Sequence, residues 1–334
     1  MPPRRGVLLF ILLLVVVGGA AFMVALNLRG PSTALTRPTV LVFRVPTDLE
    51  ESERPFRPVP FRVVHGTRTT VYSVVNGLLR AAEDDRVSAL VLHIDEVDWG
   101  WAKLTEVRDA LQRFQSAGKP IYASLAGAGD AEYYLASVAD TIGMPPSAIL
   151  ELNGLTESVM YLRGAFDKLG VTPNYAQAGE FKSAVETYTR TGMSPAARRA
   201  LDAVLDDEYG LLVDSLGVAR GLTAEAVRGL LDSGPYVAKE AVAHRLVDTL
   251  LYDAEVDSLA FRSLAGRGLT ALSFTRYAES LSPEHDGPHI ALIDAAGTIM
   301  PGKSRFTPSE GRALGSETLI EALRQARQQS FSTD

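Results

Sequence analysis

The segment AGEFKSAVETYTRTGMSP, residues 178–195, contains one lysine whose neighbours could make it a base. A free lysine has a pKa of about 10.4 and acts as a base at neutral pH only when burial or nearby positive charge lowers that value. Phe181 could contribute an apolar wall beside Lys182, whereas Glu180 and Glu186 would oppose the change if they pointed toward the amine. The segment alone therefore leaves two interpretations open, a general base and a solvated surface charge.

Other residue types favour no alternative catalyst. The chain has no cysteine, which excludes disulfides, thiolate zinc sites and a cysteine nucleophile. It contains neither a G-x-S-x-G elbow nor a P-loop. His93 lies in an apolar run, and between His285 and His289 the pair Gly287-Pro288 disfavours the helix that would align both imidazoles on a metal. We therefore predict no metal site and no cofactor.

Two further sequence patterns are weaker evidence of a functional site. Gly127 and Gly129 form a Gly-x-Gly pattern before a predicted helix, which could cradle an anion or make a tight strand-to-helix turn. Ser183 follows Lys182 directly, but neighbouring side chains on a strand or turn diverge, so this serine is not independent evidence of a nucleophile.

Alternating strand and helix patterns must position this lysine. The predicted strands are residues 39–45, 87–95, 120–127 and 141–144, and the predicted helices between them are residues 69–85, 103–118 and 130–140. Asp130 is a candidate cap for the last of these helices, and Ser194-Pro195 and Thr223 open two further helices in a mostly helical second half. This alternation predicts an α/β domain with a parallel sheet and right-handed crossovers.

The amino-terminal segment predicts a membrane anchor. Residues 7–26 are apolar and uncharged, and about 20 such residues cross a ~30 Å hydrocarbon core as a helix. Small residues at Ala20 and Ala21 leave cleavage as a secretion signal open, and the flanking arginines do not decide the orientation. The net charge of −7, without long runs of one sign, does not favour nucleic acid as a partner.

The carboxyl-terminal region repeats the beginning of the domain. Residues 288–300 resemble the first predicted strand, and residues 315–329 resemble the first predicted helix, at a period of about 250 residues. The predicted segments are 1–30 (cytoplasmic tip and transmembrane anchor), 31–60 (tether containing the first strand), 61–262 (first repeat), 263–287 (linker) and 288–334 (start of a second repeat).

Four motifs together resemble a known family. YYLASVAD, FDKLGV, GEFKSAVETYTRTGMSPAAR and AVAHRLVDTL, in this order and spacing, resemble the first repeat of signal peptide peptidase A in its long, two-repeat form. The resemblance covers roughly residues 38–262, with the start of a second repeat at 288–334. It implies an α/β domain of the Clp protease/crotonase-like class, with a parallel sheet and flanking helices, preceded by one transmembrane helix.

The resemblance also implies an activity and a role for Lys182. Members of this family are membrane-anchored serine endopeptidases that degrade cleaved signal peptides with a serine and a lysine in place of a full triad. The lysine of the family's KSA motif matches Lys182, and in the two-repeat form the serine comes from the second repeat, beyond residue 334. The loop after the strand at 87–95 reads EVDWGWAKLTE and offers neither a Gly-Gly pair nor a serine. We therefore expect this chain to supply the base without the nucleophile and to be a fragment that is inactive alone.

Partners and location are implied by the same resemblance. The implied partners are apolar peptides such as signal peptides. The implied location is the bacterial cytoplasmic membrane, with a single span and the main domain on the extracytoplasmic side. The full-length form is expected to be a homotetramer. Two other functions stay open, a non-catalytic scaffold or binding module of the same fold and a crotonase-like acyl-thioester enzyme. The predicted membrane anchor disfavours the second.

Overall fold

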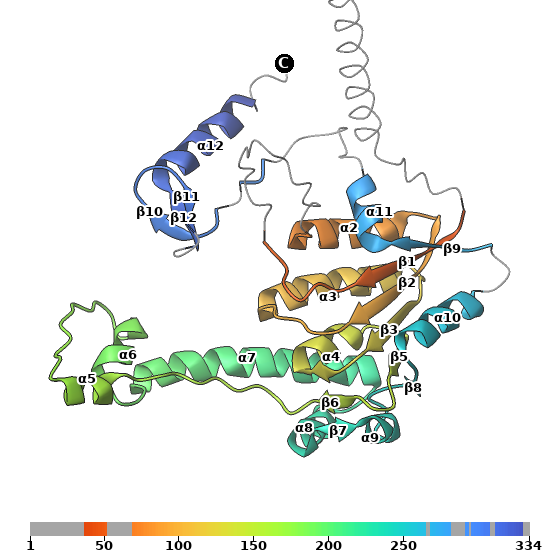
Figure 1. The fold of residues 1–334 in the computed structure, drawn as a ribbon, viewed down its shortest axis with the longest axis horizontal. Coiled ribbons are helices and arrows are strands. Elements are labelled where there is room, and N and C mark those ends of the chain that lie inside the picture. The colour runs from red at the N-terminus through yellow and green to blue at the C-terminus, as the bar shows by residue number, and fades with distance from the viewer. Residues whose placement is uncertain are drawn as a thin grey trace, which may run out of the picture.

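The computed structural model describes residues 37–51, 69–264, 268–281, 291–293, 295–307 and 311–329. Its centre is a six-stranded parallel sheet in the order β8-β5-β3-β2-β1-β9 (Figure 1). The strands are β1 (Thr39–Arg44), β2 (Val87–Ile94), β3 (Ile121–Leu125), β5 (Thr141–Met144), β8 (Thr249–Leu250) and β9 (Thr270–Ser273). The predicted α/β class with a parallel sheet is confirmed, and the four predicted strands correspond to β1, β2, β3 and β5.

Helices cover both faces of the sheet, which explains the apolar runs of its central strands. The covering helices are α2 (Val71–Glu83), α3 (Trp101–Ser116), α4 (Asp130–Ala136), α10 (Asp253–Ser263) and α11 (Phe274–Ser280). Because side chains alternate along a strand, Leu41 and Phe43 pack into the larger core with α2 and α3, whereas Val40 packs with Val256 of α10. Burying each apolar side chain of this size stabilises the fold by about 1.5–3 kcal/mol.

Hydrogen bonds confirm two of the predicted helix starts. Ser194 caps α7 (Pro195–Arg220), and Thr223 caps α8 (Ala224–Ser233), each by accepting from the backbone N–H three residues further on. Pro195 occupies the first helical position of α7, where its missing N–H leaves no hydrogen bond unmade.

Part of the predicted linker, residues 263–287, belongs to the sheet. Strand β9 pairs in parallel with β1 as an edge strand, and α11 follows it directly. The ring of Phe274 lies 4.5 Å from that of Phe43, and a Cβ on Gly77 would come within 2.8 Å of Phe274. Helix α11 therefore fits against the surface of α2 at Gly77. The edge position explains why the sequence carried little signal, since β9 is mostly exposed and lacks an apolar run.

The described residues of the sheet domain, 37–51, 69–152, 208–264 and 268–281, are called the body below, and residues 153–207 are called the arm. The arm leaves the body after β6 (Ile149–Glu151), the middle strand of a small sheet with β4 (Ala128–Gly129) and β7 (Tyr236–Val237). It contains α5 (Arg163–Leu169), the 3₁₀ helix η1 (Ser183–Val185), α6 (Glu186–Thr189) and the first half of α7, which carries it away from the sheet (Figure 1). Only Glu186 and Ala196 are buried in the arm.

The carboxyl-terminal residues form a separate small unit. Its sheet has the order β10-β12-β11, with β10 (Thr298–Met300), β11 (Arg305–Thr307) and β12 (Gly311–Gly315), and α12 (Ser316–Gln329) follows. The predicted helix at 315–329 is confirmed as α12, whereas among the described residues of the strand predicted at 288–300 only the last three are in a strand, β10. Within the described residues, no helix is long and apolar enough to cross a membrane. The predicted anchor, residues 7–26, lies outside those residues.

Candidate active site

Lys182 lies in the arm, at the end of a tight turn and directly before η1. Its backbone N–H donates to the carbonyl oxygen of Gly179 at 3.3 Å, which closes the turn. Gly179 has a φ of +93°, a conformation that residues with a Cβ rarely adopt. The Cγ of Lys182 lies 3.9 Å from the position that a Cβ on Gly179 would occupy, so the lysine side chain passes over this glycine. That distance is an ordinary van der Waals contact, so the positive φ of the turn is what requires glycine here.

Contacts within the arm itself fix the segment that follows Lys182. The carbonyl oxygen of Val185 accepts hydrogen bonds from the Tyr175 hydroxyl at 2.5 Å and from Thr189 Oγ1 at 3.1 Å. The ring of Phe166 in α5 stacks on that of Tyr188 in α6, with centroids 6.1 Å apart. The lysine is thus positioned by a small set of local contacts rather than by the sheet.

Both glutamates that flank Lys182 have other partners. Glu180 Oε2 lies 3.4 Å from Arg199 NH2 on α7. Glu186 is only 6% exposed, and its Oε2 accepts from the backbone N–H of Ser194 at 2.9 Å. Hydrogen bonds from Ser194 hold the pKa of Glu186 below its usual value, so this carboxylate is ionised at neutral pH. Among the residues that the structure describes, Lys182 forms no ion pair.

The structure does not bury Lys182. Its side chain is exposed, and Phe181, which could have formed an apolar wall, is itself 55% exposed. The guanidinium of Arg199 lies 5.7 Å from the centre of the Phe181 ring. Residues outside the arm would have to cover the Lys182 amine in order to bury it. The role of Lys182 as a base stays a prediction.

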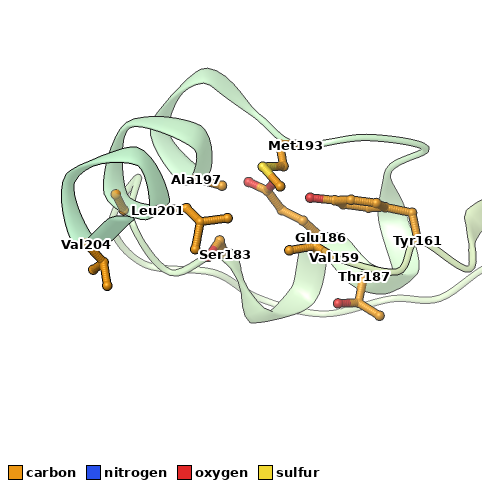
Figure 2. Close-up of a pocket in the computed structure, with 10 residues that line it drawn as sticks. Val159, Tyr161, Ser183, Glu186, Thr187, Met193, Ala197, Leu201 and Val204 are labelled. Atoms are coloured by element: carbon orange, nitrogen blue, oxygen red, sulfur yellow. The ribbon is translucent and has the colours of Figure 1, made fainter. Parts of the chain in front are cut away.

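An apolar pocket of about 240 Å³ lies beside the lysine segment (Figure 2). Its wall includes Ser183, the residue after Lys182, and apolar side chains that come from the segment before α5 and from α7. The residues used below are Val159, Tyr161, Met193, Leu201 and Val204. In Figure 2 the Glu186 carboxylate lies beside Met193 and near the Tyr161 hydroxyl, at one end of this pocket. The pocket can receive an apolar side chain.

The Gly-x-Gly pattern forms a turn whose amide is already bonded. The backbone N–H of Gly129 donates to Glu132 Oε2 at 2.9 Å, and the N–H of Val97 donates to the other oxygen of this carboxylate at 2.8 Å. Glu132 therefore occupies the position that an external anion would take, which favours the interpretation as a strand-to-helix turn.

Asp130 is not the cap that the sequence predicted. Gly129 holds the cap position of α4, with an extended backbone. The Glu132 side chain accepts from the Gly129 N–H, so the cap position needs no side chain of its own. Asp130 begins the helix, and its carboxylate accepts from the N–H of Gly154 at 3.2 Å, at the base of the arm. Burial raises the pKa of Asp130 to about 6.

His93 has a structural partner that the sequence did not indicate. Its side chain is 2% exposed, and its Nε2 lies 2.9 Å from Asp257 Oδ1 on α10. Ser124, its neighbour on β3, donates to Asp253 Oδ1 at 2.5 Å. These contacts hold α10 on the sheet, and Ser124, with 1% exposure, is out of reach of a substrate. Nothing in the local sequence marks contacts between residues so far apart in the chain.

Comparisons with known proteins relate the site to a family. Residues 113–261, which include Lys182, match Peptidase family S49. Serine protease SPPA, chloroplastic, of Arabidopsis thaliana is 30% identical over 257 residues, covering 75% of this chain and 38% of the relative. Protease 4 of Salmonella typhi is 28% identical over 271 residues, covering 77% and 43%. An Enterococcus faecium protein named as a signal peptide peptidase SppA is 23% identical over 184 residues, covering 54% and 53%.

These matches, on an α/β fold, are to proteins described as peptidases or proteases. The similarity to peptidase family S49 covers residues 113–261, which is less than half of the chain. The chain spans 38% and 43% of the lengths of the Arabidopsis and Salmonella relatives.

Solved structures show a more distant similarity. An enoyl-CoA hydratase/carnithine racemase from Magnetospirillum magneticum aligns with a TM-score of 0.34 at 17% identity, covering 59% of this chain and 64% of that chain. A similarity at this level carries no argument about function.

Proposed function

We propose that this chain is the lysine-bearing part of a membrane-anchored serine endopeptidase that degrades cleaved signal peptides. One observation carries the proposal: Lys182 lies in the range that matches family S49 and, among the described residues, has no carboxylate partner. A nearby carboxylate would favour the charged amine, which cannot accept a proton. The arm therefore leaves the amine without a carboxylate partner that would hold it in the charged form, which is one requirement of a general base.

The proposed reaction is acyl transfer by a serine–lysine dyad. The neutral amine of Lys182 accepts the proton of a serine hydroxyl while the serine oxygen attacks the peptide carbonyl. The resulting ammonium then returns that proton to the leaving amine as the peptide bond breaks. In this proposal the serine belongs to a second repeat, so the amine becomes enclosed only when that repeat lies against the arm.

The substrate, the location and the assembly are parts of the same proposal. The apolar lining of the pocket beside Ser183 suits an apolar peptide side chain, and the name of the Enterococcus relative refers to signal peptides. We propose a Clp protease/crotonase-like fold on the extracytoplasmic side of the bacterial cytoplasmic membrane, anchored by residues 7–26. The exposed arm, with two buried residues in all, suits assembly into a tetramer.

The test is the substitution Lys182→Met in a protein that contains both repeats. We expect cleavage of a small peptide ester to fall by at least about 10³-fold, because removing a member of a catalytic set has effects of this order. Circular dichroism should show an unchanged fold, since the Lys182 side chain is exposed.

Lys168→Met provides the matched control, because Lys168 is an exposed lysine on α5 of the same arm. This variant should keep the activity of the parent protein. Full activity of Lys182→Met would contradict the proposed base and would favour the alternative, a non-catalytic scaffold. The chain of residues 1–334 alone should not hydrolyse the ester, and lysine-dependent turnover by it would contradict the assignment of the nucleophile to the second repeat.

A further inference from the structure

The two glutamates near Lys182 are held in different ways. Glu186 is buried and bonded to a backbone N–H at the start of α7, where the helix dipole also stabilises negative charge. Glu180 depends on one side chain, Arg199, and both members of that ion pair are more than half exposed. Of the two carboxylates, Glu180 is therefore the one that a single substitution can release.

Glu180 could reach the lysine if it were released. Residues 179–182 form one turn, closed by the bond between Lys182 N–H and the Gly179 carbonyl. Glu180 and Lys182 are two residues apart in that turn, and both have long, exposed side chains. A carboxylate that pairs with an amine favours its protonated form.

Arg199 holds two residues of this turn at once. Its guanidinium pairs with Glu180 and lies over the Phe181 ring, so both side chains face α7. Its neighbour Arg198 is paired with Asp202 along the helix, at 3.5 Å, and is not free to replace it. The contact between the turn and α7 at this point thus depends on Arg199.

We propose that Arg199 is a positioning residue for Lys182: it holds the Glu180 carboxylate on α7 and thereby prevents this carboxylate from pairing with the lysine amine. The consequence for catalysis rests on the proposed function, because only a lysine that acts as a base needs to lose its proton. The electrostatic effect itself can be measured without catalysis.

The experiment is competitive acetylation of the folded chain with acetic anhydride at pH 8. Only the neutral amine attacks the anhydride, forming an amide and releasing acetate and a proton, so the rate at Lys182 reports its deprotonated fraction. Mass spectrometry of the peptides gives the rate at Lys182, with Lys168 as the internal reference.

We expect Arg199→Gln to lower the acetylation rate at Lys182 by about 1.5- to 5-fold, the range that corresponds to an exposed ion pair. The double variant Arg199→Gln/Glu180→Gln should restore the parent rate, because the released side chain no longer carries a charge. Arg199→Lys should keep most of the parent rate. The rate at Lys168 should stay constant in all three variants.

Two outcomes would overturn the inference. One is an unchanged rate at Lys182 in Arg199→Gln. The other is a reduced rate that the double variant fails to restore, since this would mean that Arg199 acts by supporting the turn. The result is separable from the proposed function: if Lys182→Met keeps full peptidase activity while the labelling pattern holds, the base assignment fails and the electrostatic role of Arg199 stands.

Discussion

The body and the arm differ in how their side chains are held. In the body many large side chains, including Tyr133, Tyr134, Phe43 and Phe114, are fully buried between the sheet and its helices. In the arm only Glu186 and Ala196 are buried, and large apolar side chains such as that of Met160 are exposed. The candidate base therefore lies in the part of the chain that contributes least to the core. The stability of the fold and the proposed chemistry can be changed independently.

Charged groups show the same contrast. In the body the guanidinium of Arg108 is 2% exposed and donates to the Tyr134 carbonyl and to Ser137 Oγ, at the carboxyl end of α4 where positive charge is favourable. Burial lowers the pKa of this guanidinium, and removing the side chain would take away the hydrogen bonds that it donates to these two buried groups. In the arm the pair of Glu180 and Arg199 is exposed, and such pairs contribute little to stability. Charged side chains in the arm can therefore position neighbouring side chains without stabilising the core.

The largest stability effect should come from Phe114→Ala in the body. Phe114 is completely buried on α3, and the substitution leaves a cavity in the larger core. We expect the free energy of unfolding to fall by about 3–5 kcal/mol. Urea unfolding can be followed by the fluorescence of Trp99 and Trp101, the two tryptophans of the chain, which both lie in the body. A loss below about 1 kcal/mol would mean that the core around α3 does not have the packing described.

An intermediate effect should come from Asp130→Asn, where the body meets the arm. Burial raises the pKa of Asp130 to about 6 from an ordinary 3.8, so between these pH values the folded protein binds this proton more tightly than the unfolded chain. The free energy of unfolding therefore falls as the pH rises from about 4 to about 6 and then levels off. Asparagine cannot ionise, and its amide oxygen can still accept from Gly154 N–H.

We expect Asp130→Asn to raise the free energy of unfolding at pH 7 by about 1–2 kcal/mol, which is less than the full shift implies because the carboxyl group is partly exposed. At pH 4 the variant and the parent should differ little. Urea unfolding at pH 4, 5, 6 and 7 measures this, with Asp85→Asn, an exposed carboxylate in the body, as the control. The same pH slope in Asp130→Asn and in the parent would contradict the assignment.

The body could be predicted from the sequence to a larger extent than the arm. Strands β2 and β3 are buried on both faces, so their continuous apolar runs predicted them. In the arm, the Ser194-Pro195 pair predicted only the start of α7. The edge strand β9 was missed because an exposed edge imposes no such pattern. Local patterns succeed where burial is complete and fail where it is partial.

The residues of the candidate site could be predicted from the sequence, but the contacts between them could not. The sequence placed Glu180 and Glu186 near Lys182 and could not decide whether they faced it. For Glu180 the answer depends on Arg199, which lies 19 residues further along the chain and comes close only because α7 passes beside the turn. The contact of His93 with Asp257, 164 residues away, was hidden for the same reason. Such contacts depend on the three-dimensional fold and cannot be predicted from the spacing of residues within a short segment.

The smallest stability effect should come from Phe181→Ala in the arm, the counterpart of Phe114→Ala. The substitution is the same, but Phe181 is 55% exposed, contacts Arg199 and fills no part of the core. We expect the free energy of unfolding of the body to change by no more than about 0.5 kcal/mol, as for most exposed positions. Urea unfolding followed by tryptophan fluorescence measures both phenylalanine variants under one condition. A loss close to that of Phe114→Ala would show that the arm packs on the body, and the division between a stabilising body and an exposed, lysine-bearing arm would then be wrong.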